Sequence, residues 1–316
     1  MHLSWSIVFM GTPETAAVSL EHLLKGPDPV VGVVTRPDRP AGRGQKRASS
    51  PVRRVAERHG IPVLTPTKMR DPAFLATLKS WAPQLIVVVA YGRILPESLL
   101  DLPPHGCLNV HYSLLPKYRG ASPVVWTILN NEIKGGVTTM KLVKKMDAGP
   151  VLLQAEVSLS PDETTASLEK KLTPIGAQLL LETIRGIKDG SVTPREQSEE
   201  EASYASILKK EDGEINWTES AEMIEHRVRA FTPWPSAYTY VGGKRLKVHR
   251  AAVVSAADKG LPGEVIRADG NDFWVATGMG TLSLEEVQLE NRKRLLAAEF
   301  LRGTRIEKGL RLSSGA

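Results

Sequence analysis

Short apolar segments alternate with amphipathic segments through the first part of the chain. Three of them, SIVFMG at 6–11, VVGVVT at 30–35 and LIVVVA at 85–90, are apolar almost throughout. A strand of this composition has both faces buried, which is typical of a parallel sheet that carries helices on both sides. The alternation therefore predicts an α/β fold with a Rossmann-like, mostly parallel sheet.

The pattern changes toward the C-terminus, and a length of 316 residues is enough for two domains. Short extended segments such as RLKVHRAAVV and GEVIRA follow one another with glycine-rich turns, which is typical of a small β-barrel. The stretch before them is polar and acidic and is interpreted as a linker. We predict an N-terminal domain over 1–189, a linker over 190–207 and a C-terminal OB-like β-barrel domain over 208–316.

The composition narrows the cellular setting. Hydrophobic residues make up 41% and charged residues 24% of the chain, as in an ordinary globular protein. Cys107 is the single cysteine, which excludes an intramolecular disulfide and fits a reducing cytosol. The first residues lack the features of a signal peptide, and the run at 85–90 is far too short to span a bilayer. These observations predict a cytoplasmic protein without a membrane partner.

Positive charge is concentrated in one region. Eight basic and two acidic side chains lie between Arg36 and Arg58, so this local excess equals the net charge of +6 of the whole chain. The segment TRPDRPAGRGQKRASSP also contains Pro and Gly, which favours an exposed loop. A basic, exposed loop is typical of a surface that binds a phosphate backbone, but a solvated loop and helix face would look the same.

Three polar side chains mark the end of another predicted strand, GCLNVHYS. Side chains alternate between the two faces of a strand, so Asn109, His111 and Ser113 are expected on one face. Asn and Ser are unfavourable inside strands. Ligands of open α/β sheets bind beyond the carboxyl ends of the strands. We therefore predict a functional site here.

Several kinds of chemistry are disfavoured. The seven histidines are scattered and none forms a helix-face metal motif with a carboxylate, so no metal is expected. Gly11 is the only glycine where a dinucleotide fingerprint would need three. Cys107 lies at an apolar strand start and is more typical of a buried residue than of a nucleophile. Acyl or one-carbon transfer without a covalent intermediate remains.

The polar side chains suit such a transfer. An amide can donate a hydrogen bond to a developing oxyanion, and a neighbouring imidazole can act as an acid or a charged donor. The imidazole needs a carboxylate to orient it and to keep it protonated. Asp147, in the turn KKMDAGPVL, is the best candidate, although a surface turn residue would show the same pattern.

Two segments, NVHYSLLPKYRGASP at 109–123 and MDAGPVL at 146–152, resemble the signature of the folate-dependent formyltransferases. In that family an Asn, a His and an Asp surround the formyl group of 10-formyltetrahydrofolate, which is a consumed co-substrate rather than a bound cofactor. The resemblance assigns these catalytic roles to Asn109, His111 and Asp147. It also implies a folate-binding role for two segments, which comprise Ser113, Leu114, Leu115 and Pro116, and Arg93, Ile94 and Leu95.

Within the family, the chain is most similar to the members that formylate methionyl initiator tRNA for translation initiation. GTPETA after the first strand, the basic segment RPDRPAGRGQK and RAFTPWPSAYT at the start of the C-terminal domain carry this similarity. It implies a tRNA-binding C-terminal domain and a tRNA-binding role for Arg36, Arg39, Arg43, Lys46 and Arg47. Two positions depart from the family pattern, namely Thr15, where an aromatic residue is usual, and Arg93. The alternatives are an acceptor that is a UDP-aminosugar or another small amine, and an inactive tRNA-binding module.

Overall fold

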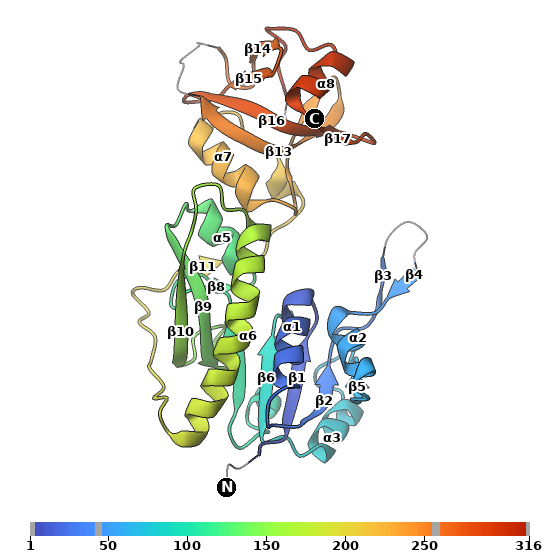
Figure 1. Cartoon of the computed structure of the whole chain (residues 1–316), viewed down its shortest axis with the longest axis vertical. Helices are drawn as coiled ribbons and strands as arrows, with labels where there is room; N and C mark the ends of the chain where they lie inside the picture. Colours follow the sequence, from blue (N-terminus) through green and yellow to red (C-terminus); the bar gives the residue numbers. More distant parts are fainter. Residues whose placement is uncertain (1–3, 42–45, 255–259, 314–316) are drawn as a thin grey trace. The chain divides into compact units, whose positions relative to one another are not determined.

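The structure is a computed structural model and describes residues 4–41, 46–254 and 260–313, with backbone only for 39–41 and 46–47. The chain divides into two compact units (Figure 1). The N-terminal unit comprises Met1–Pro123, Lys134–Ser158 and Glu169–Ser206, and the C-terminal unit comprises Val124–Ile133, Leu159–Leu168 and Ile207–Ala316. The boundaries predicted from the sequence, at 189 and 208, stay a prediction.

A seven-stranded sheet forms the centre of the N-terminal unit. Its strands, in spatial order, are β10 (Val151–Ser158), β9 (Lys134–Lys141), β7 (Cys107–His111), β6 (Leu85–Val89), β1 (Ile7–Gly11), β2 (Val30–Val34) and β5 (Val63–Leu64). The five strands from β7 to β5 are parallel, and β9 and β10 join them antiparallel. The predicted Rossmann-like, mostly parallel sheet is therefore confirmed.

Helices cover both faces of this sheet. They are α1 (Glu14–Leu23), α2 (Pro51–Arg58), α3 (Pro72–Ser80), α4 (Glu97–Leu100) and α6 (Thr165–Asp189), which also contributes to the C-terminal unit. Phe74 of α3 and Leu99 of α4 pack against one face, in a cluster that contains Val8 and Cys107. On the opposite face Gly176 of α6 lies against Val110, where an added Cβ would come within 3.2 Å of that side chain. Burial on both faces explains why these strands are apolar throughout.

The C-terminal unit is built on an antiparallel sheet. Its strands are β12 (Ala237–Val241), β13 (Lys244–Val254), β14 (Val265–Asp269), β15 (Asp272–Ala276), β16 (Thr281–Leu289) and β17 (Arg294–Leu296), accompanied by α5 (Pro123–Leu129), the 3-10 turn Glu211–Gly213, α7 (Ala221–Ala230) and α8 (Ala297–Gly303). Near the end of the chain, Ser313 pairs with Tyr240 of the edge strand β12, and Leu310 accepts a hydrogen bond from Val265 of the other edge strand. The last segment thus joins the two edges, as expected for a small barrel.

The basic segment after β2 forms a β-hairpin rather than an irregular loop. Strands β3 (Arg39–Ala41) and β4 (Lys46–Ala48) pair antiparallel, and the hairpin extends away from the sheet of the N-terminal unit (Figure 1). The side chains of Arg39, Lys46 and Arg47 are not described. Arg43 lies outside the described residues.

Residues 190–207, interpreted as a linker from their composition, run along the N-terminal unit. Arg195 forms a two-way backbone bridge with Val151, with both N–H···O distances at 2.8 Å. Farther on, β11 (Tyr204–Ala205) pairs parallel with the short strand β8 (Arg119–Gly120). We call residues 195–205 the strap.

Among the described residues, no helix combines the length and the hydrophobicity that a membrane span requires.

Candidate active site

The predicted polar side chains lie at the carboxyl end of β7. Asn109 and His111 occupy the same face as Cys107, opposite Val110, and their side chains are almost buried, with residue exposures of 9% and 5%. Ser113 follows the strand and is 1% exposed. The parallel neighbour β6 and the antiparallel neighbour β9 fix the register, in which Asn109 pairs with Val88 and with Met140. The strand thus presents an amide and an imidazole side by side.

Asp147 reaches this strand end from the segment that connects β9 and β10. Its carboxylate Oδ2 lies 3.8 Å from Nδ1 of His111, and its side chain is 15% exposed. The same Oδ2 accepts a hydrogen bond of 2.9 Å from the backbone N–H of Gly120. Asp147 has a φ of +48°, in the left-handed region that Asp and Asn tolerate best among non-glycine residues. The carboxylate therefore faces the imidazole and is not the side chain of an exposed turn.

His111 lies between two acceptors. Its Nε2 is 2.9 Å from the backbone carbonyl of Tyr118, which can only accept a hydrogen bond, and its Nδ1 faces Asp147. Nε2 therefore carries a proton, because a carbonyl oxygen cannot donate one. The separation of 3.8 Å suits an ion pair but is too long for a hydrogen bond. Nδ1 thus makes no hydrogen bond with Asp147 and is open to a substrate group.

The Asn109 side chain makes no hydrogen bond with any residue that the structure describes. With a residue exposure of 9%, the amide keeps some contact with solvent, so its hydrogen-bonding positions are open to water or a ligand. An amide that is not engaged by the described residues, next to the His111–Asp147 pair, is therefore a donor available to a ligand. This environment is what distinguishes Asn109 from a structural asparagine.

Side chains of the predicted folate segment 113–116 contact other parts of the protein. The Ser113 hydroxyl donates to the carbonyl of Lys117 at 2.6 Å, and Leu115 is buried against Met140 and Val151. Thr138 Oγ1 donates to the Ser113 carbonyl at 2.6 Å and accepts from the N–H of Leu115 at 3.1 Å. The Leu114 side chain covers Gly136 of β9, and the Leu115–Pro116 peptide bond is cis. The segment is therefore a fixed wall beside β7.

The second predicted folate segment, Arg93, Ile94 and Leu95, follows β6, and its three side chains have different environments. Arg93 donates to the carbonyls of Pro66 and Thr67 at 3.0 and 2.8 Å, and Leu95 is buried against α4. Ile94 is 75% exposed. Of these three residues, Ile94 is the one with a side chain open to a ligand.

Arg36, predicted to bind nucleic acid, lies beside this same segment. A Cβ added to Gly92, whose φ is +75°, would lie 3.4 Å from Nη1 of Arg36, so the guanidinium covers the turn after β6. The Nε atom of Arg36 is buried and has no hydrogen-bond partner among the residues described. Arg36 therefore sits where the predicted folate and tRNA contacts meet.

The arginines of α2 have acidic partners. The ion pairs are Arg53–Asp38 at 2.9 Å, Arg53–Glu57 at 2.7 Å, Arg54–Glu14 at 3.9 Å and Arg58–Glu21 at 2.9 Å. Two of these carboxylates, those of Glu14 and Glu21, belong to α1 and therefore lie outside the basic region between Arg36 and Arg58. The pairs neutralise much of the positive charge on the helix and leave the excess on Arg36 and the hairpin.

Cys107 does not have the properties of a nucleophile. Burial, followed by the negative charge of Asp101, raises the pKa of its thiol to about 12. Its Sγ points to the carbonyl of Leu99 at 3.5 Å. The thiolate form that nucleophilic attack requires is therefore scarcely populated near neutral pH, and the interpretation of Cys107 as a buried core residue is favoured.

Several groups at the site carried no sequence signal. The Tyr118 carbonyl, the Gly120 N–H and the side chains of Thr138 and Gln197 all hold candidate catalytic residues or wall residues in place. Main-chain groups cannot be recognised from residue type, and Gln197 stands in a polar stretch that resembled a linker. Among these residues, Gly120 is the one whose type reflects its position, because a φ of +122° and close approach to the Ala205 carbonyl require a glycine.

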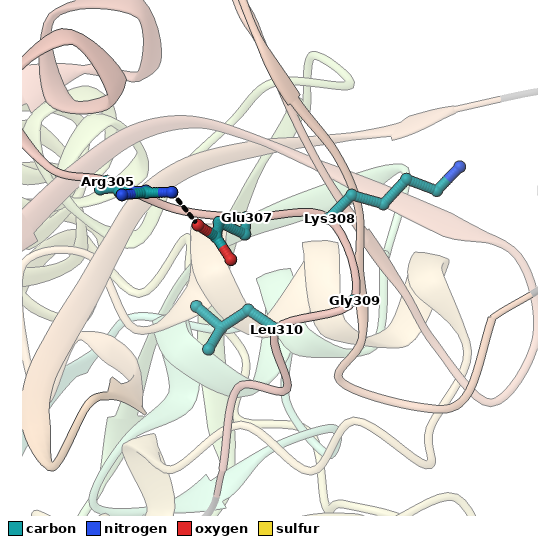
Figure 2. Close-up of a pocket in the computed structure, with 5 residues that line it drawn as sticks. All are labelled: Arg305, Glu307, Lys308, Gly309 and Leu310. Atoms are coloured by element: carbon teal, nitrogen blue, oxygen red, sulfur yellow. Dashed lines mark ion pairs between the residues drawn. The ribbon is translucent and has the colours of Figure 1, made fainter.

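A surface pocket of the C-terminal unit has no evident part in this chemistry. It is lined by Arg305, Glu307, Lys308, Gly309 and Leu310, and Figure 2 shows the Lys308 amine turned away from the other side chains. Arg305 and Glu307 form a solvent-exposed ion pair of 2.7 Å, a kind that contributes little energy. No group of three or more potential metal ligands occurs in the described parts of the chain.

Comparisons with known proteins agree with this geometry. The model of the formyl transferase family matches residues 5–184, and that of the formyl transferase C-terminal domain matches residues 207–305. A methionyl-tRNA formyltransferase of Geobacter metallireducens is 47% identical over 97% of this chain and 98% of its own length. The corresponding protein of Desulfotalea psychrophila is 47% identical over 96% of this chain and 94% of its own.

Solved structures share the fold at low sequence identity. The N-formyltransferase from Helicobacter canadensis in complex with folinic acid and dTDP-3-aminofucose has a TM-score of 0.65 at 19% identity, over 89% of this chain and 98% of that chain. HypX from Aquifex aeolicus in complex with tetrahydrofolic acid has a TM-score of 0.61 at 19% identity, over 95% of this chain and 47% of that chain. At such identities the likeness shows the fold alone, and the family follows from the sequence matches. The chain therefore belongs to the formyl transferase family, and within it to the methionyl-tRNA formyltransferases.

Proposed function

We propose that this protein transfers the formyl group of 10-formyltetrahydrofolate to the α-amino group of methionine esterified to initiator tRNA. The observation that carries the chemistry is the almost buried Asn109 amide, which no described residue engages in a hydrogen bond and which lies beside the His111–Asp147 pair. The names of relatives that match nearly the whole chain support the acceptor. Formylation of initiator tRNA belongs to translation initiation, and we place it in the cytoplasm, in keeping with the free Cys107.

The reaction follows from the positions of these groups. The neutral amine attacks the formyl carbon, and the carbonyl π electrons move to oxygen. The Asn109 amide and the Nδ1–H of His111 donate to this oxyanion, while the Asp147 carboxylate compensates the positive charge of the ring. When the tetrahedral intermediate collapses, the bond to the folate nitrogen breaks. The proton lost by the amine reaches that nitrogen through His111 or a water molecule.

The donor site is proposed at the wall formed by 113–116 and the segment after β6. Because the side chains of Ser113 and Leu115 are engaged inside the protein, the first segment acts through its fixed shape. Ile94 offers an exposed apolar surface to a flat ring system. In this proposal the folate is a consumed co-substrate and not a permanently bound cofactor.

Replacing Ile94 with Ala is expected to raise the KM for the folate donor about tenfold, with a much smaller effect on kcat. The change removes apolar contact area at the proposed donor site, and burial of each methylene group contributes about 0.8 kcal/mol. Initial rates at varied donor concentration measure the effect. Ile133→Ala is the matched control, since Ile133 is 76% exposed but belongs to the C-terminal unit. Equal donor KM values for the two variants would remove Ile94 from the donor site.

The acceptor site is proposed to include the basic hairpin together with Arg36. Ion pairs neutralise the arginines of α2, so the remaining basic residues of this region are Arg36 and those of the hairpin segment. A hairpin with basic residues can reach along a phosphate backbone. The β-barrel domain over 208–316 is proposed as a second tRNA-binding surface.

Arg43→Ala is expected to raise the KM for methionyl-tRNA about tenfold and to flatten the salt dependence of tRNA binding by roughly one unit of log–log slope. The expectation rests on the sequence, in which Arg43 lies between two glycines, Gly42 and Gly44, that permit close approach to a ligand. Filter binding across a salt series gives the slope.

The control for this prediction is Arg58→Ala, because Arg58 is paired with Glu21 at 2.9 Å and lies outside the hairpin. It should leave the salt slope unchanged. Slow hydrolysis of the formyl donor without tRNA should also be unchanged in the Arg43 variant, which shows that the active site is intact. If deletion of Gly42–Lys46 leaves both tRNA formylation and the slope intact, the hairpin is only a solvated surface.

The experiment that tests the reaction itself uses 10-formyltetrahydrofolate labelled in the formyl carbon and charged initiator tRNA. Mild base hydrolysis of the ester should release labelled N-formylmethionine. A purified protein that binds the tRNA but releases no labelled product would favour the inactive binding module.

A further inference from the structure

The strap, residues 195–205, touches the turn that carries Asp147 and the segment 118–120 that supports His111 and Asp147. Near its start, Gln197 contacts the turn that contains Asp147. Near its end, Ser203 accepts from the N–H of Arg119 at 2.8 Å with its carbonyl and from the N–H of Tyr118 at 2.9 Å with its hydroxyl. The Tyr118 carbonyl in turn accepts from His111. One segment therefore connects the backbone supports of His111 and of Asp147.

Gln197 uses its whole amide in this arrangement. Nε2 lies 2.9 Å from the carbonyl of Asp147 and 2.7 Å from the carbonyl of Gly149, and Oε1 accepts from Nε of Arg119 at 2.9 Å. Carbonyls only accept and a guanidinium only donates, so these three partners define which end of the amide is nitrogen. The side chain thus clamps the turn on both sides of Ala148.

Arg119 is itself fixed. Its side chain is fully buried, and Nη1 donates to Oε1 of Glu199, which also forms an ion pair with Lys145. The turn is confined from the opposite side as well, since a Cβ on Gly149 would come within 1.8 Å of the Lys141 carbonyl. Gln197, which is bonded to the buried Arg119, therefore holds the turn on one side, and the end of β9 confines it on the other.

Asp147 needs such a clamp. Its backbone has a φ of +48°, which costs energy in a non-glycine residue and persists when its surroundings impose it. Without the bonds from Gln197, the turn can relax and the distance of 3.8 Å between Asp147 and His111 is no longer imposed. A displacement of about 1 Å at a catalytic group can reduce a rate by roughly 10²-fold.

We propose that Gln197 is a positioning residue of the transfer reaction, which sets the Asp147 carboxylate against His111 through the two carbonyls of the turn. The inference about turnover rests on the proposed function, whereas the inference about the turn itself does not. Gln197 touches no substrate in this account and acts only through Asp147.

The main test compares Gln197→Ala and Gln197→Glu with the wild type. Both variants should lower kcat by about 10- to 100-fold and leave the KM of either substrate within about threefold. Gln197→Glu is informative because it keeps the shape and strengthens the partner for Arg119, yet it places acceptor oxygens against two carbonyls. A residue that only fills space or pairs with Arg119 would tolerate Glu, so near-normal turnover in this variant overturns the proposal.

A double-mutant cycle shows whether the effect passes through Asp147. In an Asp147→Asn background, measured as single turnovers at high enzyme concentration, Gln197→Ala should cost less than about threefold, because the carboxylate that it positions is absent. If the two losses multiply in full, Gln197 acts elsewhere and the proposal fails. Gln178→Ala, an exposed glutamine bonded to Glu182 on α6, is the matched control and should change neither quantity.

Hydrogen exchange tests the clamp without reference to activity. In the full chain, Gln197→Glu should increase amide exchange in a peptide that covers 142–150, whereas Gln178→Ala should not, with both melting temperatures close to that of the wild type. Unchanged exchange at 142–150 overturns the inference even if the reaction is confirmed. Increased exchange in a protein that transfers no formyl group would instead place the failure in the proposed function.

Discussion

Replacing Asn109 or His111 with Ala is expected to lower the turnover number for formyl transfer by about 10²–10³, the effect of losing one donor to an oxyanion. In both cases the variant removes a hydrogen bond that strengthens as negative charge develops on the formyl oxygen. Single-turnover rates with labelled donor and charged tRNA measure the loss.

Donor binding should change little in either variant, because the wall at 113–116 is held by Thr138 and Ser113 and not by the two replaced side chains. Equilibrium dialysis with a non-transferable folate checks this point. His59→Ala, an exposed histidine at the end of α2, is the matched control and should retain full activity. Near-normal turnover in the Asn109 or His111 variant would show that the site has been assigned to the wrong residues.

Asp147→Asn is expected to cause a loss of similar size, on the order of 10²–10³. Asn suits the left-handed backbone of this turn and can still accept from the N–H of Gly120, so the change removes the charge and keeps the shape. Single-turnover rates with labelled donor and charged tRNA measure the loss.

Asp147→Ala is the informative companion, since it combines loss of charge with strain at a φ of +48° and should also lower the melting temperature. The Asn variant should not. If Asp147→Asn keeps the turnover number of the wild type, Asp147 is a turn residue without a role in the chemistry.

Much of the N-terminal sheet could be predicted because local composition determines it. The strands β1 and β6 are buried along their whole length, and the corresponding apolar runs stand out from the flanking residues. The hairpin of β3 and β4 was missed, since its residues are basic and include Pro40, which a strand prediction disfavours. Pairing between two short segments can override such a preference.

Only part of the candidate site could be predicted from the sequence. Strand alternation placed Asn109 and His111 on one face, as the structure has them. The approach of Asp147 depends on how β9 and β10 return to β7, a long-range contact that no local pattern encodes, so the family resemblance was needed to find it. Their catalytic roles stay a prediction.

The contacts of the strap could not be predicted from the sequence for the same reason. Gln197 lies in a polar, acidic stretch, and its side-chain hydrogen bonds go to residues far away in the sequence. Arg119, a fully buried arginine, was indistinguishable from an exposed basic residue. Polar side chains reveal their partners only when the fold is known, because side-chain hydrogen bonds leave no periodic pattern.

The central claim is most directly tested by the acceptor preference of the purified protein. Labelled 10-formyltetrahydrofolate should be offered in parallel with methionyl initiator tRNA, a UDP-aminosugar and glycinamide ribonucleotide, and kcat/KM compared. We predict that the kcat/KM for methionyl-tRNA exceeds those for both small amines by at least about 10³-fold. Raising the salt concentration should lower the value for methionyl-tRNA and leave the values for the small amines unchanged. A kcat/KM for either small amine that equals or exceeds the value for methionyl-tRNA would contradict the account.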